Sequence, residues 1–130
     1  MPKALVVDDS KAVRIIIGRT LKELGYEVGE AGNGLHAIDV LAAEPGSFSL
    51  LLADWNMPEM NGFELLLALR RKPEYSSLVI VMVTTETEVG QMSAALEAGA
   101  NEYIMKPFTK DVLVEKLELL GFETAARARN

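Results

Sequence analysis

The chain contains no cysteine, and this absence excludes several kinds of site at once. Disulfides, thiolate catalysis and cysteine-ligated zinc are impossible, and a chain without thiols fits a reducing compartment. The sequence also lacks an apolar run of about 18 residues, the length needed for a membrane-spanning helix. Its start reaches an acid at Asp8, too early for the apolar segment of a signal peptide. We therefore expect a soluble cytoplasmic protein with no membrane insertion.

Positive charge is scarce as well. The net charge is −6, which argues against electrostatic binding to nucleic acid or to anionic lipid. No internal repeat and no low-complexity linker interrupts the 130 residues. With 49% hydrophobic and 25% charged residues, the composition is that of a globular chain, and the length suits one domain.

Short apolar runs alternate with helical patterns along the whole chain. The runs predict strands at 4–7, 26–28, 50–53, 78–83 and 102–105. Periodic apolar faces predict helices at 10–24, 35–42, 63–71 and 88–98, and a last helix capped by Thr109 and ended by Gly121. This alternation predicts an α/β fold: five β–α units forming a doubly wound, parallel five-stranded sheet in a single domain. The polar second strand is expected near an edge and the third strand at the centre.

Polar residues follow four of the five predicted strands. Asp8 and Asp9 follow the first strand, Asp54 the third, Thr84 the fourth and Lys106 the fifth. The carboxyl ends of parallel strands lie along one edge, where ligands bind in such sheets. Three carboxylates brought together repel one another and need a cation. Oxygen ligands without histidine or cysteine select a hard ion, most plausibly Mg²⁺.

A carboxylate cluster with a metal, an ammonium group and a hydroxyl describes a phosphoryl-transfer site. Asp54, at the end of the predicted central strand, is the candidate nucleophile, because a carboxylate can form an aspartyl phosphate. Each residue also has an ordinary reading. Asp8 and Asp9 could cap a helix, Thr84 could be a turn residue and Lys106 a solvated side chain. Those readings require four independent coincidences at four strand ends.

At this point the chain resembles a known family, the receiver domains of two-component response regulators, and most of all its single-domain chemotaxis members. The likeness spans residues 3 to about 120, nearly the whole chain, and it implies the flavodoxin-like version of the predicted fold. It is carried by residues 6–10 (VVDDS), 54–58 (DWNMP), 61–62 (NG), 83–84 (VT), 99–100 (GA), Tyr103 and 106–109 (KPFT).

The resemblance implies that Asp54 accepts a phosphoryl group from a histidine kinase. Asp9 and Asp54 would bind Mg²⁺ directly, Asp8 through water, and Asn56 through its backbone carbonyl. Lys106 would contact the phosphoryl group, with a cis peptide between it and Pro107. The protein would then be a switch and not an enzyme, catalysing only its own phosphoryl transfer and autodephosphorylation.

The resemblance also implies how the signal leaves. Thr84 would move towards the phosphoryl oxygen and Tyr103 would swing inward into the vacated space. Taken alone, Tyr103 is more simply a core residue. The fourth helix, fifth strand and fifth helix would form the face read by partners, and the protein would be a monomer. Residues 1–121 are expected to form the domain. The tail at 122–130 is a frayed helix extension, a docking segment or disordered, and is too short to be an output domain.

The sequence does not identify the output partner. A flagellar motor switch is the chemotaxis possibility, and a phosphorelay intermediate or a regulator of a kinase outside chemotaxis is the alternative. Asn56 and Glu86 stand at positions that tune loss of the phosphoryl group in this family, and their identities predict a short-lived aspartyl phosphate. Thr85 stands where many relatives carry Ala or Ser, and it is expected to alter access to Asp54.

Two unrelated functions compete with this interpretation. A phosphohydrolase of the haloacid-dehalogenase type also uses an aspartyl phosphate, but it wants an acid two places after its nucleophile on strand one. Ser10 and Lys11 stand at those places here. A flavodoxin-like flavin protein needs a phosphate-binding loop after that strand, where Asp8 and Asp9 would repel a phosphate. The single histidine, His36, is expected to be solvated on a helix away from the strand ends, which argues against a phosphohistidine.

Overall fold

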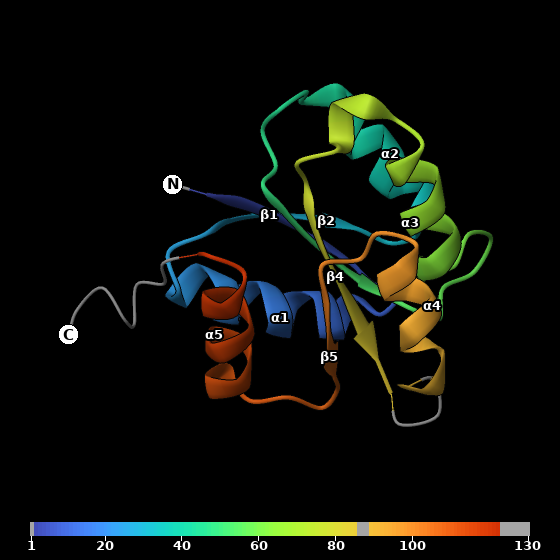
Figure 1. Cartoon of the computed structure of the whole chain (residues 1–130). Helices are drawn as coiled ribbons and strands as arrows, with labels where there is room; N and C mark the ends of the chain where they lie inside the picture. The colour runs from blue at the N-terminus through green and yellow to red at the C-terminus, as the bar shows by residue number, and fades with distance from the viewer. Residues whose placement is uncertain (1, 86–88, 123–130) are drawn as a thin grey trace.

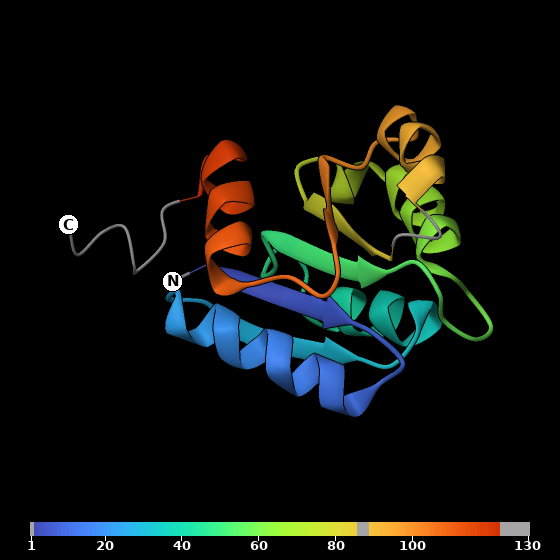
Figure 2. The ribbon, with the colours of Figure 1, turned by 90° about the horizontal axis from the view of Figure 1, so that it is seen from below.

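The computed structural model describes residues 2–85 and 89–122. A single five-stranded sheet forms its middle layer, with strand order β2-β1-β3-β4-β5 and every neighbouring pair parallel. Figure 2 shows the blue, cyan and green strands with their arrowheads pointing the same way. The strands are β1 (Lys3–Val7), β2 (Glu27–Ala31), β3 (Leu50–Asp54), β4 (Val79–Thr84) and β5 (Glu102–Met105).

Helices cover both faces of this sheet, as Figure 1 shows, with α1 and α5 on one face and α2, α3 and α4 on the other. The chain order places each of them between two strands or after the last one. The helices are α1 (Lys11–Glu23), α2 (Gly34–Ala43), α3 (Gly62–Arg70), α4 (Met92–Glu97) and α5 (Lys110–Leu119). Two short 3₁₀ turns, η1 (Pro73–Tyr75) and η2 (Val89–Gln91), complete the described elements.

The core consists of two apolar layers, one on each side of the sheet, because successive strand side chains point to opposite faces. Leu5, Leu51 and Ile80 pack with α2, α3 and α4 on one side. Val6, Leu52 and Val81 pack with α1 and α5 on the other. Strands β1, β3 and β4 are therefore apolar on both faces, which explains their unbroken apolar runs.

The predicted α/β architecture is confirmed, with β2 at an edge and β3 at the centre. Most element bounds lie within about one residue of the expectation, and two elements, β2 and α4, differ by more. β2 begins at Glu27 and continues to Ala31, because its pairing with β1 extends the strand beyond the apolar residues. Within the described part of the helix expected over 88–98, Met92–Glu97 is α-helical. The preceding residues, Val89–Gln91, form a 3₁₀ turn, because Gly90 disfavours the helix and the cap residue Gln91 makes no side-chain hydrogen bond.

The tail expected at 122–130 lies outside the described residues except for Phe122. Within the described ranges, no helix combines the length and the apolar character required to cross a membrane.

Candidate functional site

The carboxyl edge of the sheet gathers the residues that the sequence places at strand ends. Asp54 and Thr84 are the last residues of β3 and β4, Asp8 directly follows β1, and Lys106 directly follows β5. The register brings them to one level, since Asp54 pairs with Val83 and the Lys106 N–H donates to the Thr84 carbonyl at 2.7 Å. The predicted convergence at this edge is confirmed.

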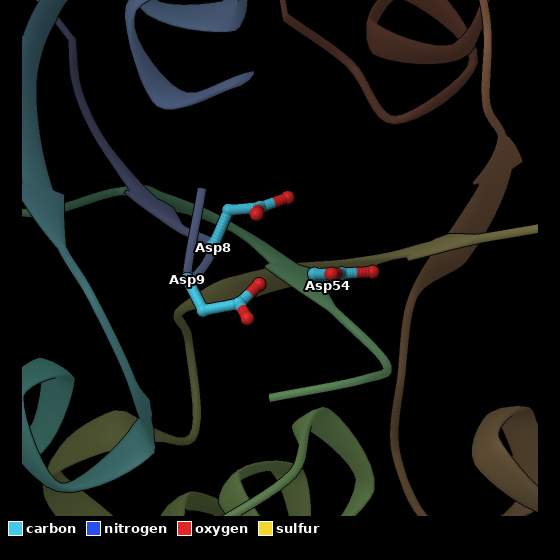
Figure 3. Close-up of side chains that lie close together, drawn as sticks. All are labelled: Asp8, Asp9 and Asp54. Atoms are coloured by element: carbon cyan, nitrogen blue, oxygen red, sulfur yellow. The ribbon is translucent and has the colours of Figure 1, made fainter. Parts of the chain in front are cut away.

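Three carboxylates form the centre of the site. Each of Asp8, Asp9 and Asp54 offers an oxygen within 4.8 Å of the other two. Figure 3 shows the three side chains extending to the same side, Asp8 and Asp9 from the segment after β1 and Asp54 from the end of β3. Asp8 and Asp54 are buried, with 2% and 6% of their surface exposed, whereas Asp9 is exposed. The cluster is thus buried on one side and open to solvent at Asp9.

Lys106 supplies the positive charge of the site. Its Nζ lies 3.4 Å from Asp8 Oδ2 and 3.4 Å from Asp54 Oδ1. The ammonium therefore bridges the two buried carboxylates and offsets part of their mutual repulsion. The peptide between Lys106 and Pro107 is cis, as the resemblance implies.

The charges perturb one another's titration. Burial raises the pKa of the Asp54 carboxyl above its ordinary value; Asp8 raises it further, and Lys106 opposes both effects. Burial lowers the pKa of the Lys106 ammonium, but the carboxylates of Asp54 and Asp8 outweigh it and the net pKa is raised. In the absence of a cation, the site therefore carries a carboxylate with an enhanced affinity for positive charge.

The donor set fits a hard divalent cation. Three carboxylates come from two adjacent strand ends, and their oxygens are close enough to share one ion. Without neutralisation the cluster holds three acidic groups against one lysine, so a cation completes its charge balance. The ligand role expected for the Asn56 carbonyl stays a prediction.

The loop after β3 leads back to the end of that strand, so that Gly62 packs against the backbone of Asp54 and Trp55. Trp55 N–H donates to the Val83 carbonyl at 3.1 Å, and Gly62 N–H donates to the Trp55 carbonyl at 2.9 Å. A Cβ on Gly62 would lie 2.3 Å from the Asp54 carbonyl oxygen, so only glycine fits there. The Trp55 ring stacks on Phe63 with centroids 5.3 Å apart. Asp54 is therefore fixed by the first residue of α3 as well as by the sheet.

Thr84 is completely buried at the end of β4, one residue beyond the Val83 that pairs with Asp54, and its hydroxyl donates to the Thr85 carbonyl at 3.1 Å. Tyr103 on β5 is half-buried and packs against the larger apolar layer. The Lys116 Nζ lies 5.2 Å from its ring centroid and 3.5 Å from Glu102 Oε1. The switch roles of Thr84 and Tyr103 stay predictions, and Glu86 lies outside the described residues.

An apolar groove of about 420 Å³ opens between α1 and the β5–α5 loop, beside Lys106. It is lined by Val13, Ile16, Ile17, Thr20, Thr85, Lys106, Pro107, Phe108 and Lys110. Lys106 is therefore shared by the groove and the site, and Thr85 lines the groove.

Sequence reasoning missed one polar contact of the site. Arg14 on α1 donates through Nη1 to the Asp8 carbonyl at 2.6 Å and through Nε to Glu30 Oε1 at 3.0 Å. The sequence did contain a hint: Arg14 lies near the N-terminus of its helix, where acidic residues are favoured, and a cation there suggests a specific contact. His36 is exposed as expected, but its Nδ1 accepts from Gly32 N–H at 3.3 Å, just beyond the end of β2. The expectation that it lies away from the strand ends is wrong, because α2 begins at that edge.

Comparisons with known proteins agree with this geometry. The family model of the response regulator receiver domain matches residues 4–118. The chain is 50% identical over 117 residues to the chemotaxis protein CheY homolog of Campylobacter jejuni, covering 89% of each chain. It is 48% identical over 119 residues to chemotaxis protein CheY1 of Helicobacter pylori, covering 91% of this chain and 95% of the relative.

Among solved structures, chemotaxis protein CheY4 of Vibrio cholerae superposes with a TM-score of 0.83 at 35% identity, covering 92% of this chain and 98% of that one. Sequence, fold and the arrangement of the strand ends agree: the chain belongs to the response regulator receiver domain family of two-component systems.

Proposed function

We propose that this receiver domain accepts a phosphoryl group on Asp54 from a histidine kinase, in a Mg²⁺-dependent reaction, and passes the signal on by protein contact. One observation carries the proposal. The oxygens of Asp8, Asp9 and Asp54 lie within 4.8 Å of one another, and Lys106 Nζ is 3.4 Å from two of these carboxylates. This is a cation site with a nucleophile and a fixed positive charge in contact.

The chemistry is a displacement at phosphorus. An oxygen of the Asp54 carboxylate attacks the phosphorus atom, and the bond from phosphorus to the donor's imidazole nitrogen breaks with its electron pair leaving on nitrogen. Lys106 lies against Asp54 and neutralises charge on the equatorial oxygens of the transferring group. Asp9 and Asp54 directly, Asp8 through water and the Asn56 backbone carbonyl would hold a Mg²⁺, which would supply further charge neutralisation.

A switch at Thr84 and Tyr103 connects this chemistry to the surface. The Thr84 hydroxyl must leave the Thr85 carbonyl to bond a phosphoryl oxygen, because one donor serves both acceptors. Tyr103 on β5 pairs with Met82, two residues before Thr84 at the end of the neighbouring β4. Movement of Thr84 towards the phosphoryl group would then free space for Tyr103. The Asp54 phosphoryl group thus biases a two-state element.

The α4–β5–α5 face is our candidate for the output surface. Apolar side chains are exposed on all three of its elements: Leu96 on α4, Met105 on β5, and Val112 and Leu119 on α5. We infer a chemotaxis output, such as a flagellar motor switch, because the similar proteins from Campylobacter jejuni and Helicobacter pylori are named chemotaxis proteins. A role as a phosphorelay intermediate is the alternative, and co-purification with a motor-switch protein only after phosphorylation would separate the two.

The test of this function is phosphorylation by a small donor. We would incubate the purified chain with acetyl phosphate and Mg²⁺, and follow intact mass together with Trp55 fluorescence. The expected result is one added phosphoryl group, dependent on Mg²⁺, present in the exposed-surface control Asp39→Asn and absent in Asp54→Asn. A phosphoryl group that persists in Asp54→Asn would contradict the proposal.

The same sample tests how long the Asp54 phosphoryl group persists and whether the protein turns over phosphate esters as an enzyme would. Asn56, together with Glu86, leads us to propose rapid loss of the phosphoryl group after the donor is removed. Steady hydrolysis of p-nitrophenyl phosphate, beyond one phosphoryl group per chain, would instead favour a phosphohydrolase.

A further inference from the structure

Arg14 and Glu30 hold the peptide group that joins two of the three clustered aspartates. Asp8 and Asp9 are consecutive, so a single peptide connects them, and its carbonyl belongs to Asp8. Arg14 Nη1 donates to that carbonyl oxygen at 2.6 Å, while Arg14 Nε lies 3.0 Å from Glu30 Oε1. The guanidinium, on α1, therefore ties the end of β1 to a carboxylate on β2.

The geometry makes Asp9 dependent on this contact. Asp8 is held independently, because its N–H donates to the Ala31 carbonyl at 3.1 Å and its Oδ1 accepts from Ser10 N–H at 2.9 Å. Asp9 is exposed, and a peptide group is planar, so the direction of the Asp8 carbonyl sets where the Asp9 backbone lies. The hydrogen bond from Arg14 therefore orients the carboxylate that opens to solvent.

This pair differs from an ordinary surface ion pair, which contributes little. The Arg14 side chain is only 17% exposed, and it uses two different nitrogens, one on the Asp8 backbone carbonyl and one on the exposed Glu30 carboxylate. Its planar fork matches that arrangement, whereas a lysine ammonium on a flexible stem does not. Glu30 also compensates the positive charge of Arg14, which would otherwise disfavour a cation at the neighbouring carboxylates.

We infer that Arg14 is a positioning residue for the cation site, acting through the Asp8–Asp9 peptide, and that Glu30 holds the Arg14 guanidinium and balances its positive charge. This inference rests on the proposed function, because it requires a cation at the three carboxylates. Supporting groups of this kind raise metal affinity by orienting the ligands, and their removal weakens binding about tenfold or more.

The test is Mg²⁺ titration of the whole chain without any phosphodonor, followed by Trp55 fluorescence and by calorimetry. We expect Arg14→Lys to weaken Mg²⁺ binding about tenfold although the charge is kept, and the loss to persist in high salt. Arg14→Met should also weaken binding, even though it removes a repelling charge. Glu30→Gln keeps an acceptor for Nε, so its loss should be smaller and should fade as salt screens the unbalanced Arg14.

Arg19→Lys and Arg19→Met, at an exposed position of the same helix, are the matched controls and should bind Mg²⁺ like the unmodified chain. Circular dichroism at the titration temperature verifies that each variant is folded. Wild-type affinity in folded Arg14→Lys, or tighter binding in Arg14→Met, would overturn the positioning role and leave the proposed function standing. An unmodified chain that binds no Mg²⁺ would overturn both.

Discussion

Asp54 is a carboxylate that the fold keeps almost entirely away from water. Burial, followed by the neighbouring Asp8, raises its pKa, and Lys106 only partly offsets this. The folded protein therefore binds the Asp54 proton more tightly than the unfolded chain does. As pH rises from the ordinary aspartate pKa through the raised folded pKa, the unfolded state loses this proton first. The Asp54 contribution to stability is thus present in acid and lost as pH rises through that window.

Replacing Asp54 with a neutral residue removes the destabilisation that its ionisation causes at neutral pH. We expect Asp54→Asn to raise the free energy of unfolding at neutral pH without Mg²⁺, with the gain shrinking below the ordinary aspartate pKa. Urea denaturation at both pH values measures it, and the exposed Asp39→Asn serves as the control. A gain of equal size in acid and at neutral pH would contradict the assignment to ionisation.

At the scale of elements, the site depends on how closely α3 approaches β3. Gly62 begins α3, and a Cβ at this position would lie 2.3 Å from the Asp54 carbonyl oxygen and 2.9 Å from Met82 Cε. One of the neighbours is backbone, so the helix must shift to accommodate a side chain.

We expect Gly62→Ala to lower the free energy of unfolding by about 2 kcal/mol and to slow phosphorylation from acetyl phosphate, because Asp54 moves with its carbonyl. Gly90→Ala is the matched control, since a Cβ there meets nothing within 4 Å; it should not lower the free energy of unfolding and could raise it by up to about 1 kcal/mol, because alanine favours a helix over glycine. Urea denaturation gives both values. Equal stability of the two variants would show that α3 yields without cost.

The opposite end of α3 is held by Arg70. Its guanidinium donates to the carbonyls of Gly99, Tyr75 and Leu78 at 2.7–2.9 Å, and to Asn101 Oδ1 at 2.9 Å. The same Asn101 oxygen accepts from Ile80 N–H at 2.8 Å. One side chain thus joins α3 to the loops that precede β4 and β5.

Arg70→Met would leave these acceptors unsatisfied in a partly buried place. We expect a loss of about 2–3 kcal/mol in the free energy of unfolding. Arg71→Met, at the exposed next residue, should change it by less than about 0.5 kcal/mol. Chemical denaturation of the two variants side by side checks the difference. A small effect at Arg70 would mean that water replaces its contacts.

At the scale of the whole molecule, the sequence predicts what depends on periodicity and on the geometry of parallel sheets. The alternation of apolar runs and helical patterns predicts the sheet and its two helical layers. Because the strands are parallel, their carboxyl ends bring Asp8, Asp54 and Lys106 to one edge, whatever the exact bounds of the helices between them. The confirmed central place of β3 follows from its five buried residues.

Contacts made by long side chains could not be predicted in this way. Arg14 on α1 contacts β2, and Arg70 contacts the loops before β4 and β5. Helical periodicity predicts the face on which a residue lies, but not which distant atoms a long side chain contacts. The helix expected over 88–98 is present as α4, but its short extent was not predicted, because an apolar pattern does not show where a helix with a glycine near its start becomes α-helical. The bounds of β2 depend on pairing with β1, which its own residues do not encode.

The measurement that tests the central claim most directly is the position of the acyl phosphate. We would phosphorylate the chain with acetyl phosphate and Mg²⁺, reduce it with borohydride, and map peptides by mass spectrometry. Borohydride converts an aspartyl phosphate to homoserine, so the modified residue is identified. We predict homoserine at Asp54 alone, and none when Mg²⁺ is omitted. Homoserine at Asp8 or Asp9, or phosphate retained on a serine or threonine, would contradict the account.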